Sequence, residues 1–363
     1  MQRVLLDGGV ATELERRGKN LTQGALWSAR CIQTDAEELA EVHIAYLRAG
    51  AHVISSSTYQ AFVLTLQREL ALSPHGARAL VRRGVEIAVQ ARDLFVAEQR
   101  QAEPHSPEKH ARFVAASTGP YGAFLADGSE YVGKYGGQAD SVTALKAFHR
   151  TQIECFVGTR ADLVLFETVP NANEIQAIGE LMNEPEFGAL PYAISLQCRV
   201  SDAGCSLLAD GSPVSAVVTK LVELDRFGST RSLCAIGVNC VSPNDVKRFV
   251  LDIRAGIQEA QQSNTSADPT HAHARETRAF MAFLASRTND ARLPFVMSYP
   301  NSGEVYNAGS KTWQWPYLCS QTGDFDSETN RIEKWRELQL SSGAEILGGC
   351  CRTTPAFIHA LGD

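Results

Sequence analysis

The stretch that decides the fold lies near the end of the chain and reads Glu345-Ile346-Leu347-Gly348-Gly349-Cys350-Cys351-Arg352-Thr353-Thr354-Pro355. A short apolar run ends here in two adjacent thiols, and a helix-start signal follows at once. Either Thr353 or Thr354 can cap a helix whose first residue is Pro355. The segment therefore predicts a β-strand that delivers Cys350 and Cys351 at its carboxyl end, directly before an α-helix.

The same order of strand and helix recurs along the chain. Eight apolar runs are predicted to be strands, at residues 4–9, 52–59, 113–120, 163–170, 192–198, 235–240, 295–301 and 345–351. Apolar residues at helical spacing predict helices at residues 36–50, 75–99, 141–158, 171–183, 212–226, 242–258, 331–342 and 354–361. Several of the strand runs are almost continuously apolar, which is typical of parallel strands covered on both faces. Eight such units favour an α/β fold of the (β/α)8 TIM-barrel type, as one domain over residues 1–363.

An open, doubly wound sheet is the alternative fold. A glycine-rich phosphate loop after the first strand would favour it, but residues 7–12 read DGGVAT and do not fit the G-x-G-x-x-G pattern. Two polar segments interrupt the repeats, at residues 98–112 and 259–276, and both are predicted to be loop insertions. In a barrel the carboxyl ends of all strands meet at one mouth, where we expect the functional residues.

Charge and composition exclude several classes of protein. The net charge of −7 argues against a nucleic-acid partner. No stretch approaches 18 continuous apolar residues, so no membrane span is expected. The chain enters a predicted strand at once, which leaves no room for a signal peptide, and we therefore expect a cytoplasmic protein. The nine cysteines then indicate free thiols and metal ligands instead of a disulfide framework.

A third cysteine stands in a position comparable to the adjacent pair. Cys240 ends the predicted strand at residues 235–240 and precedes a second helix-start signal. Three thiols at strand ends predict a zinc site with the ligands Cys240, Cys350 and Cys351 and one open position, which is the arrangement of a catalytic zinc. Buried structural cysteines, or a disulfide between the two neighbours, are the alternatives. Cys198, which ends another run, is a less favoured ligand.

Two carboxylates also end apolar strands. Asp7 and Glu167 occupy positions that are costly for a charge unless the group is paired or used. One interpretation is that they receive a substrate ammonium group; a helix cap, a salt bridge or a tight turn is the other. The loops at residues 119–131 and 299–306 are rich in aromatic, glycine and polar residues, which suits a cationic ligand at the mouth as well as ordinary turns.

Taken together, these segments resemble the homocysteine S-methyltransferase family. The matching segments lie at residues 7–13, 26–30, 57–61, 119–131, 166–168, 237–240, 299–306 and 348–355. The loops at residues 125–131 and 301–306 are more similar to the branch that uses S-methylmethionine or S-adenosylmethionine. Thr168 departs from the betaine-dependent branch, which has tyrosine at that position. The resemblance implies a zinc-bearing (β/α)8 barrel that makes methionine from homocysteine.

The resemblance also implies roles for individual residues. Cys240, Cys350 and Cys351 would bind Zn²⁺ and through it activate the substrate thiol. Homocysteine would lie against residues from several strand ends, namely Asp7, Gly8, Gly9, Thr58, Glu167 and Asn239, with its amino group held by the two acids. In the two aromatic loops, the candidates for the side of the methyl donor are Tyr121, Asn301 and Glu304.

The chemistry explains why three thiolates would be wanted. Zn²⁺ deprotonates a coordinated thiol, and three cysteinate ligands keep the site negatively charged, so the substrate sulfur stays electron-rich. A sulfonium donor loses its charge on displacement, so no acid or base is needed there. The nearest alternative is methylation of a related thiol or selenol such as selenocysteine. A non-catalytic zinc-binding or thiol-redox protein is the alternative from a different class.

Overall fold

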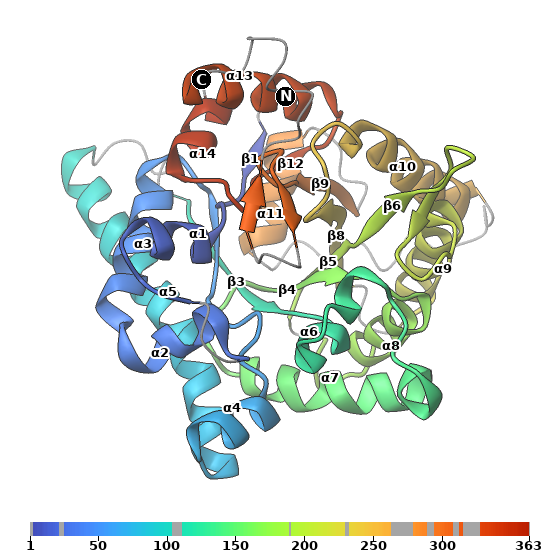
Figure 1. Ribbon diagram of the computed structural model, residues 1–363, viewed down its shortest axis with the longest axis horizontal. Coiled ribbons are helices and arrows are strands. Elements are labelled where there is room, and N and C mark those ends of the chain that lie inside the picture. The colour runs from blue at the N-terminus through green and yellow to red at the C-terminus, as the bar shows by residue number, and fades with distance from the viewer. Residues whose placement is uncertain are drawn as a thin grey trace.

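The strands of the computed structural model form a closed ring (Figure 1). The structure describes residues 3–21, 25–103, 111–188, 190–228, 232–262, 279–288, 294–307, 312–314 and 327–362. Neighbouring strands of the ring are parallel and follow the order β1-β12-β9-β8-β5-β4-β3-β2, and a parallel bridge between Leu6 and Val53 joins its two ends. The expected (β/α)8 barrel is confirmed.

The strands of the ring are short. Their bounds are Val4–Leu5 (β1), Val53–Ser55 (β2), Phe113–Thr118 (β3), Leu163–Val169 (β4), Tyr192–Leu196 (β5), Leu233–Asn239 (β8), Phe295–Tyr299 (β9) and Ile346–Leu347 (β12). Two antiparallel hairpins lie outside the ring, after β5 and after β9. They are made by β6 (Cys198–Val200) with β7 (Ser206–Leu208) and by β10 (Val305–Asn307) with β11 (Thr312–Gln314).

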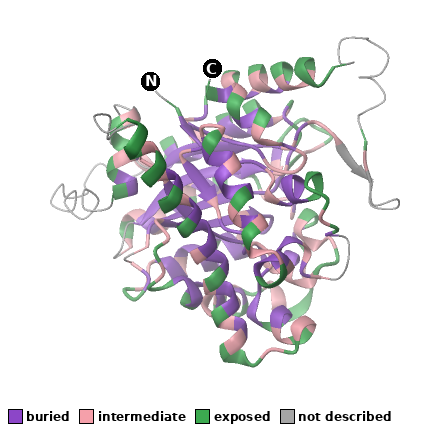
Figure 2. Cartoon of the chain, turned by 90° about the vertical axis from the view of Figure 1, so that its left-hand side faces the viewer, coloured by how far each residue is buried: buried purple, intermediate pink, exposed green. Residues whose placement is uncertain are grey.

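Helices surround the ring, and their exposed faces point outward (Figure 2). They are α1 (Val10–Arg16), α2 (Cys31–Thr34), α3 (Ala36–Arg48), α4 (Val63–Leu70), α5 (Pro74–Ala102), α6 (Tyr121–Leu125), α7 (Val142–Phe156), α8 (Ala172–Met182), α9 (Val214–Phe227), α10 (Val246–Gln262), α11 (Ala279–Thr288), α13 (Glu328–Ser341) and α14 (Pro355–Gly362). Single 3₁₀ turns lie at Trp27–Arg30 (η1), Ser129–Tyr131 (η3) and Gly137–Asp140 (η4). Side chains of Ser73, Ser141 and Asn171 cap α5, α7 and α8 by accepting a backbone N–H bond.

Alternation along the strands separates two apolar cores. Leu163 and Leu165 of β4 belong to the core that fills the barrel, whereas Val164 and Phe166 belong to the core between the sheet and the helices. The other strands follow the same period of two, because successive side chains of a strand point to opposite faces. The apolar filling of the barrel is therefore a packed core, and it closes the barrel below the mouth.

A polar layer lies on top of the filling of the barrel. Further along six of the strands, on the same face as the inward apolar positions, lie Ser55, Ser117, Glu167, Ser195, Asn239 and Tyr299. All of them lie near the carboxyl ends of their strands, where active sites of this fold are built. The barrel thus presents a set of hydrogen-bonding and titratable groups to the mouth.

Several predicted bounds are wrong. The runs at residues 4–9, 52–59 and 345–351 were expected to be strands throughout, but only their first residues join the ladder, because the glycine and polar residues that follow turn into the loops of the mouth. Both predicted insertions begin later than expected. The insertion predicted at residues 98–112 begins after Ala102, where α5 ends, and the insertion predicted at residues 259–276 begins after Gln262, where α10 ends. Residues 104–110 and 263–278 lie outside the described part of the chain.

None of the helices in the described ranges has the length and apolarity that a membrane crossing requires. The extent of one domain over residues 1–363 stays a prediction.

Candidate active site

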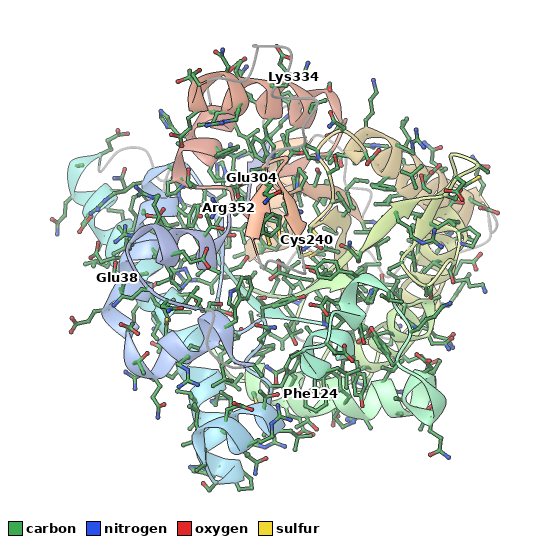
Figure 3. All side chains as sticks on the ribbon, viewed as in Figure 1. Glu38, Phe124, Cys240, Glu304, Lys334 and Arg352 are labelled. Carbon is green, nitrogen blue, oxygen red and sulfur yellow. The ribbon has the colours of Figure 1, made fainter. Side chains whose placement is uncertain are left out.

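The three thiols singled out in the sequence come together at the mouth. Cys240 follows β8, and Cys350 and Cys351 follow β12, two strands away in the ring. The Cys240 sulfur lies 2.6 Å from that of Cys350 and 3.7 Å from that of Cys351, and the three sulfurs lie within 4.8 Å of one another. Figure 3 shows Cys240 near the middle of the ring of strands. All three residues are partly exposed, so this thiol cluster is accessible to a ligand from the mouth.

Close packing of backbone explains the glycines before the adjacent cysteines. A Cβ atom on Gly349 would lie 2.2 Å from the Thr353 hydroxyl oxygen, so no other residue fits there. The Thr353 hydroxyl donates to the Cys350 carbonyl over 2.7 Å and accepts from the Gly9 N–H over 3.2 Å. The loop that carries Cys350 is therefore tied to the turn that follows β1.

Gly8 and Gly9 have a packing role in this turn. A Cβ atom on Gly8 would lie 2.8 Å from the Tyr46 ring, and the Tyr46 hydroxyl lies 3.0 Å from the Gly9 and Thr353 carbonyl oxygens. These contacts hold the two loops together without any substrate. Contact of Gly8 and Gly9 with homocysteine stays a prediction.

Two acidic groups lie in the polar layer beneath the mouth. The Asp7 carboxylate accepts hydrogen bonds from the Ser55 N–H over 2.7 Å and from the Ser55 hydroxyl over 3.1 Å. The Glu167 carboxylate accepts one from the Ser117 hydroxyl. Asp7 is buried, and Glu167 is partly exposed.

Burial raises the pKa of Asp7 to about 8, against the hydrogen bonds from Ser55, and the charge of Glu167 acts in the same direction as burial. Burial also raises the pKa of Glu167 to about 8, against the Ser117 and Tyr299 hydroxyls, and the Cys350 thiolate charge adds to the rise. Two carboxyl groups with such pKa values lack a positive neighbour, and a bound cation would ionise both.

Asn239 joins the carboxylate side of the mouth to the thiols. Its amide oxygen accepts from the Thr168 N–H over 2.9 Å, and its amide nitrogen donates to the Thr168 hydroxyl over 2.8 Å and lies 3.8 Å from the Cys350 sulfur. Thr168 has a left-handed φ of 61°, and Cys240 one of 52°, conformations that non-glycine residues seldom adopt. The buried Asn239 side chain thus holds a strained strand end in place. From the sequence, Thr168 indicated only that the chain departs from the betaine-dependent branch.

Thr58 lies beside the site but faces the helices. Its hydroxyl donates to the Ser117 carbonyl over 2.6 Å and lies 2.6 Å from the Ser56 hydroxyl, while its methyl group packs against Gly84 of α5. The hydroxyl is therefore used within the barrel. A direct contact of Thr58 with substrate stays a prediction.

The three residues expected on the donor side lie in different surroundings. The Tyr121 ring packs in an aromatic cluster with Phe124, Tyr135 and Phe148, at centroid distances of 5.5, 5.3 and 5.0 Å. The Asn301 carbonyl accepts from the Trp335 indole over 3.0 Å.

Glu304 accepts from the Arg352 guanidinium over 2.9 Å and from the Ser302 hydroxyl over 3.1 Å, and Figure 3 shows Glu304 and Arg352 side by side. Arg352 directly follows Cys351, so this ion pair ties the loop after β9 to the thiol loop. The negative charge of Glu304 already has a cationic partner.

Sequence reasoning missed Tyr59, Glu130 and Tyr131. Tyr59 follows β2, and Glu130 and Tyr131 lie in the loop after β3, so all three belong to the side of the barrel that carries the thiols. The aromatic loop at residues 119–131 was recognised in the sequence, but only the fold shows which of its residues reach the middle of the mouth.

The comparisons with known proteins identify the family of this chain. The family model of homocysteine S-methyltransferase matches residues 4–363. This chain belongs to the homocysteine S-methyltransferase family. A homocysteine S-methyltransferase of Escherichia coli (strain K12) is 36% identical, and the match covers 99% of this chain and 94% of that protein. A selenocysteine Se-methyltransferase of Brassica oleracea var. italica is 33% identical, with 98% and 87% covered.

A solved structure shows the same fold in this methyltransferase family. The metallated form of the homocysteine methyltransferase MmuM from Escherichia coli superimposes with a TM-score of 0.68 at 32% identity, and the match covers 100% of this chain and 96% of that one. The resemblance to a methyltransferase family that was noted in the sequence motifs is thus confirmed.

Proposed function

We propose that this protein transfers a methyl group from a sulfonium donor, S-methylmethionine or S-adenosylmethionine, to the thiol of L-homocysteine and forms methionine, with zinc as cofactor. The observation that carries the proposal is the placement, at one barrel mouth, of three thiols and of two carboxyl groups whose pKa is raised. Membership of the homocysteine S-methyltransferase family supports it.

The thiol cluster fits a zinc ion. Cys240, Cys350 and Cys351 supply three soft sulfur donors within reach of one ion, on the accessible side of the barrel. Zinc would supply the positive charge that keeps a substrate thiol ionised at neutral pH. The metallated structure of the Escherichia coli relative supports a metal, and its identity as zinc is our proposal.

Asp7 and Glu167 would hold the homocysteine ammonium group. Both carboxyls lie in the polar layer, where burial weakens competition from water and strengthens attraction to a cation. The charge of Cys350 acts on Glu167 and that of Glu167 acts on Asp7, so a short amino acid can place its ammonium at the acids and its sulfur at the thiol cluster. Asn239, bound to Thr168, keeps the neighbouring strand ends fixed.

The methyl transfer is a direct displacement. The homocysteine sulfur provides the electron pair of the new carbon–sulfur bond, and the electron pair of the broken bond returns to the donor sulfur, which becomes a neutral thioether. The thiol proton leaves to solvent. Because positive charge disappears from the donor, the protein needs no acid on that side, and its residues act by alignment.

Replacement of one thiol tests this function. We expect Cys350→Ser to lose both zinc and methionine formation, measured as metal content by mass spectrometry and as turnover with homocysteine and S-methylmethionine. Cys205→Ser is the matched control, because Cys205 is exposed in the hairpin after β5. Full zinc content with normal turnover in Cys350→Ser would refute the assignment.

Methylation of a selenol is a second candidate activity. The relative named as a selenocysteine Se-methyltransferase, at 33% identity, favours it. A comparison of kcat/KM for homocysteine and selenocysteine with the same donor decides between them. The cytoplasmic location and the absence of a nucleic-acid partner stay predictions.

A further inference from the structure

The loop after β3 is fixed in place by a buried glutamate of α8. Glu174 accepts from the Tyr121 N–H over 2.6 Å, lies 2.8 Å from His149 Nε2 and accepts from the Tyr135 hydroxyl. Glu174 and His149 are both fully buried. Residues 121–135 are therefore held at both ends, and the part between them has a defined position.

The middle of this loop packs tightly against its own beginning. A Cβ atom on Gly122 would lie 2.4 Å from the Glu130 nitrogen, so α6 and the following 3₁₀ turn are in backbone contact. Asn171, the cap of α8, donates to the Gly133 carbonyl over 2.8 Å just beyond the turn. Glu130 and Tyr131, in the turn, thus sit on a rigid support.

The Glu130 carboxylate has an unusual environment. Its Oε2 atom has no accessible surface and no hydrogen-bond partner among the residues that the structure describes. Burial raises the pKa of this group. A buried carboxylate oxygen without a donor is costly, and a cationic ligand would remove that cost.

Two tyrosines share this environment with Glu130. The Tyr59 ring packs against Gly119, and the charges of Glu130 and Cys240 contribute, after burial, to a raised pKa of Tyr59. Tyr131 is about half exposed, at 50%, and belongs to the same 3₁₀ turn as Glu130. The Tyr59 side chain is hydrogen-bonded to Thr168, which in turn binds Asn239, the residue before Cys240, so the rings and the carboxylate lie on the side of the mouth that carries the thiol cluster.

The other carboxylates near the thiols already have a role or a partner. Asp7 and Glu167 are assigned to the homocysteine ammonium, and Glu304 is paired with Arg352 over 2.9 Å. Glu130 forms no ion pair within the described ranges. It is the carboxylate that remains for a second cation.

We propose that Glu130, together with the rings of Tyr59 and Tyr131, binds the sulfonium centre of the methyl donor above the thiol cluster. A carboxylate attracts the sulfonium charge, and tyrosine rings add cation–π attraction. This assignment rests on the proposed function, and it places the donor at the 3₁₀ turn that holds Glu130 and Tyr131 instead of beside Tyr121 or Glu304.

The charge balance of the reaction predicts a particular kinetic signature. Methyl transfer converts the sulfonium to a neutral thioether, so the attraction to Glu130 weakens on the way to the transition state. An interaction that is stronger in the ground state than in the transition state lowers KM without raising kcat. Loss of the Glu130 charge should therefore raise the KM for the donor and leave kcat unchanged or slightly higher.

Glu130→Gln tests the subsite, with Asp127→Asn as the control. Asp127 is an exposed acid of the same loop, and its Ser129 hydrogen bonds can be kept by asparagine. We expect the KM for S-methylmethionine to rise about tenfold in Glu130→Gln, at an unchanged KM for homocysteine, and to change less than about twofold in the control. Tyr131→Ala should raise the donor KM severalfold, whereas Tyr131→Phe should not.

Calorimetry without homocysteine gives a readout independent of turnover. The zinc-loaded protein should bind S-methylmethionine more tightly than methionine, its uncharged thioether, and Glu130→Gln should abolish this preference. An unchanged donor KM, or an equal loss of affinity for both ligands, would overturn the proposal. Absence of turnover in the unmodified protein would instead refute the proposed function, and the calorimetric comparison would still decide the subsite.

Discussion

Glu167 and Glu174 are seven residues apart in the sequence, but the surroundings of their carboxyl groups are opposite in kind. Glu174, at the start of α8, is fully buried and has the Tyr121 N–H, the Tyr135 hydroxyl and the His149 ring around its two oxygens. Glu167, near the end of β4, accepts from the Ser117 hydroxyl, and burial raises its pKa to about 8. Figure 1 shows β4 as a strand of the ring and α8 among the helices outside it.

This contrast separates a structural acid from a functional one. A buried carboxylate surrounded by donors gains stability from its hydrogen bonds and fixes the elements that supply them. A buried carboxylate with few donors lowers stability when it is ionised, and a bound cation reverses that cost. Glu174 is the more deeply buried of the two, and its larger number of hydrogen-bond partners explains why it can still serve as a structural group.

The largest effect is expected at the structural acid. Glu174→Ala removes the common partner of the buried His149 and the partly buried Tyr135, and we expect a loss of about 3 kcal/mol in the free energy of unfolding. Urea unfolding followed by circular dichroism measures it. Gln176→Ala, on an exposed position of the same helix, is the control and should change stability by less than about 0.5 kcal/mol. A near-neutral Glu174→Ala would remove the distinction between the two glutamates.

The functional acid should show the reverse pattern, with weaker binding in a stable protein. Glu167→Gln removes the charge that we assign to the homocysteine ammonium, and we expect the KM for homocysteine to rise between about tenfold and a hundredfold, or about 1.4 to 2.8 kcal/mol. Zinc content should stay the same. Initial rates at saturating donor give the KM, and an unchanged value would contradict the ammonium-receptor role.

The pH dependence of stability sharpens the same contrast. The folded-state pKa of Glu167 lies above its unfolded value, so between about pH 4.5 and pH 8 the folded protein holds a proton that the unfolded chain has lost. Stability from this group is complete below pH 4.5 and falls as the pH rises through 8. Glu167→Gln should match the unmodified protein at pH 4.5 and exceed it by roughly 1 to 2 kcal/mol at pH 9, without homocysteine.

Asp7→Asn should behave in the same way, since the pKa of Asp7 is raised from 3.8 to about 8. Thermal or urea unfolding at a series of pH values measures both variants. A stability difference that does not change with pH would show that these carboxyls are ionised throughout, and the contrast with Glu174 would then have another origin.

The smallest effect is expected at Thr58. Because its hydroxyl is bound to the Ser117 carbonyl and lies beside the Ser56 hydroxyl, Thr58→Val should cost about 1 kcal/mol of stability and change the KM for homocysteine less than about twofold. Thr58→Ser, which keeps the hydroxyl, is the control. A tenfold rise in the KM for homocysteine in Thr58→Val, but not in Thr58→Ser, would support the substrate contact that the family resemblance implies.

The ring of strands could be predicted because its signal is local. Apolar runs such as residues 163–170 and 235–240 contain both the inward and the outward positions of a buried strand, and the predicted centres are right. The predicted ends of the strands were less accurate. Glycine and polar residues follow Leu5 and Leu347, and such residues occur both at the end of a strand and in a loop. Helices α1, α2, α4, α6 and α11 were missed because they are short or stand outside the regular order.

The sequence by itself singled out the candidate site residues, because three thiols and two acids end predicted strands of one parallel barrel, whose strand ends meet at one mouth. Tertiary structure decided which groups face one another. Glu130 and Tyr131 follow a different strand from Cys240, and only the closed ring and the anchor at Glu174 bring them to the same mouth. Glu167 and Glu174 differ in the number of hydrogen-bond donors around them. These donors come from segments that are distant in the sequence, so the local sequence around each acid does not predict them.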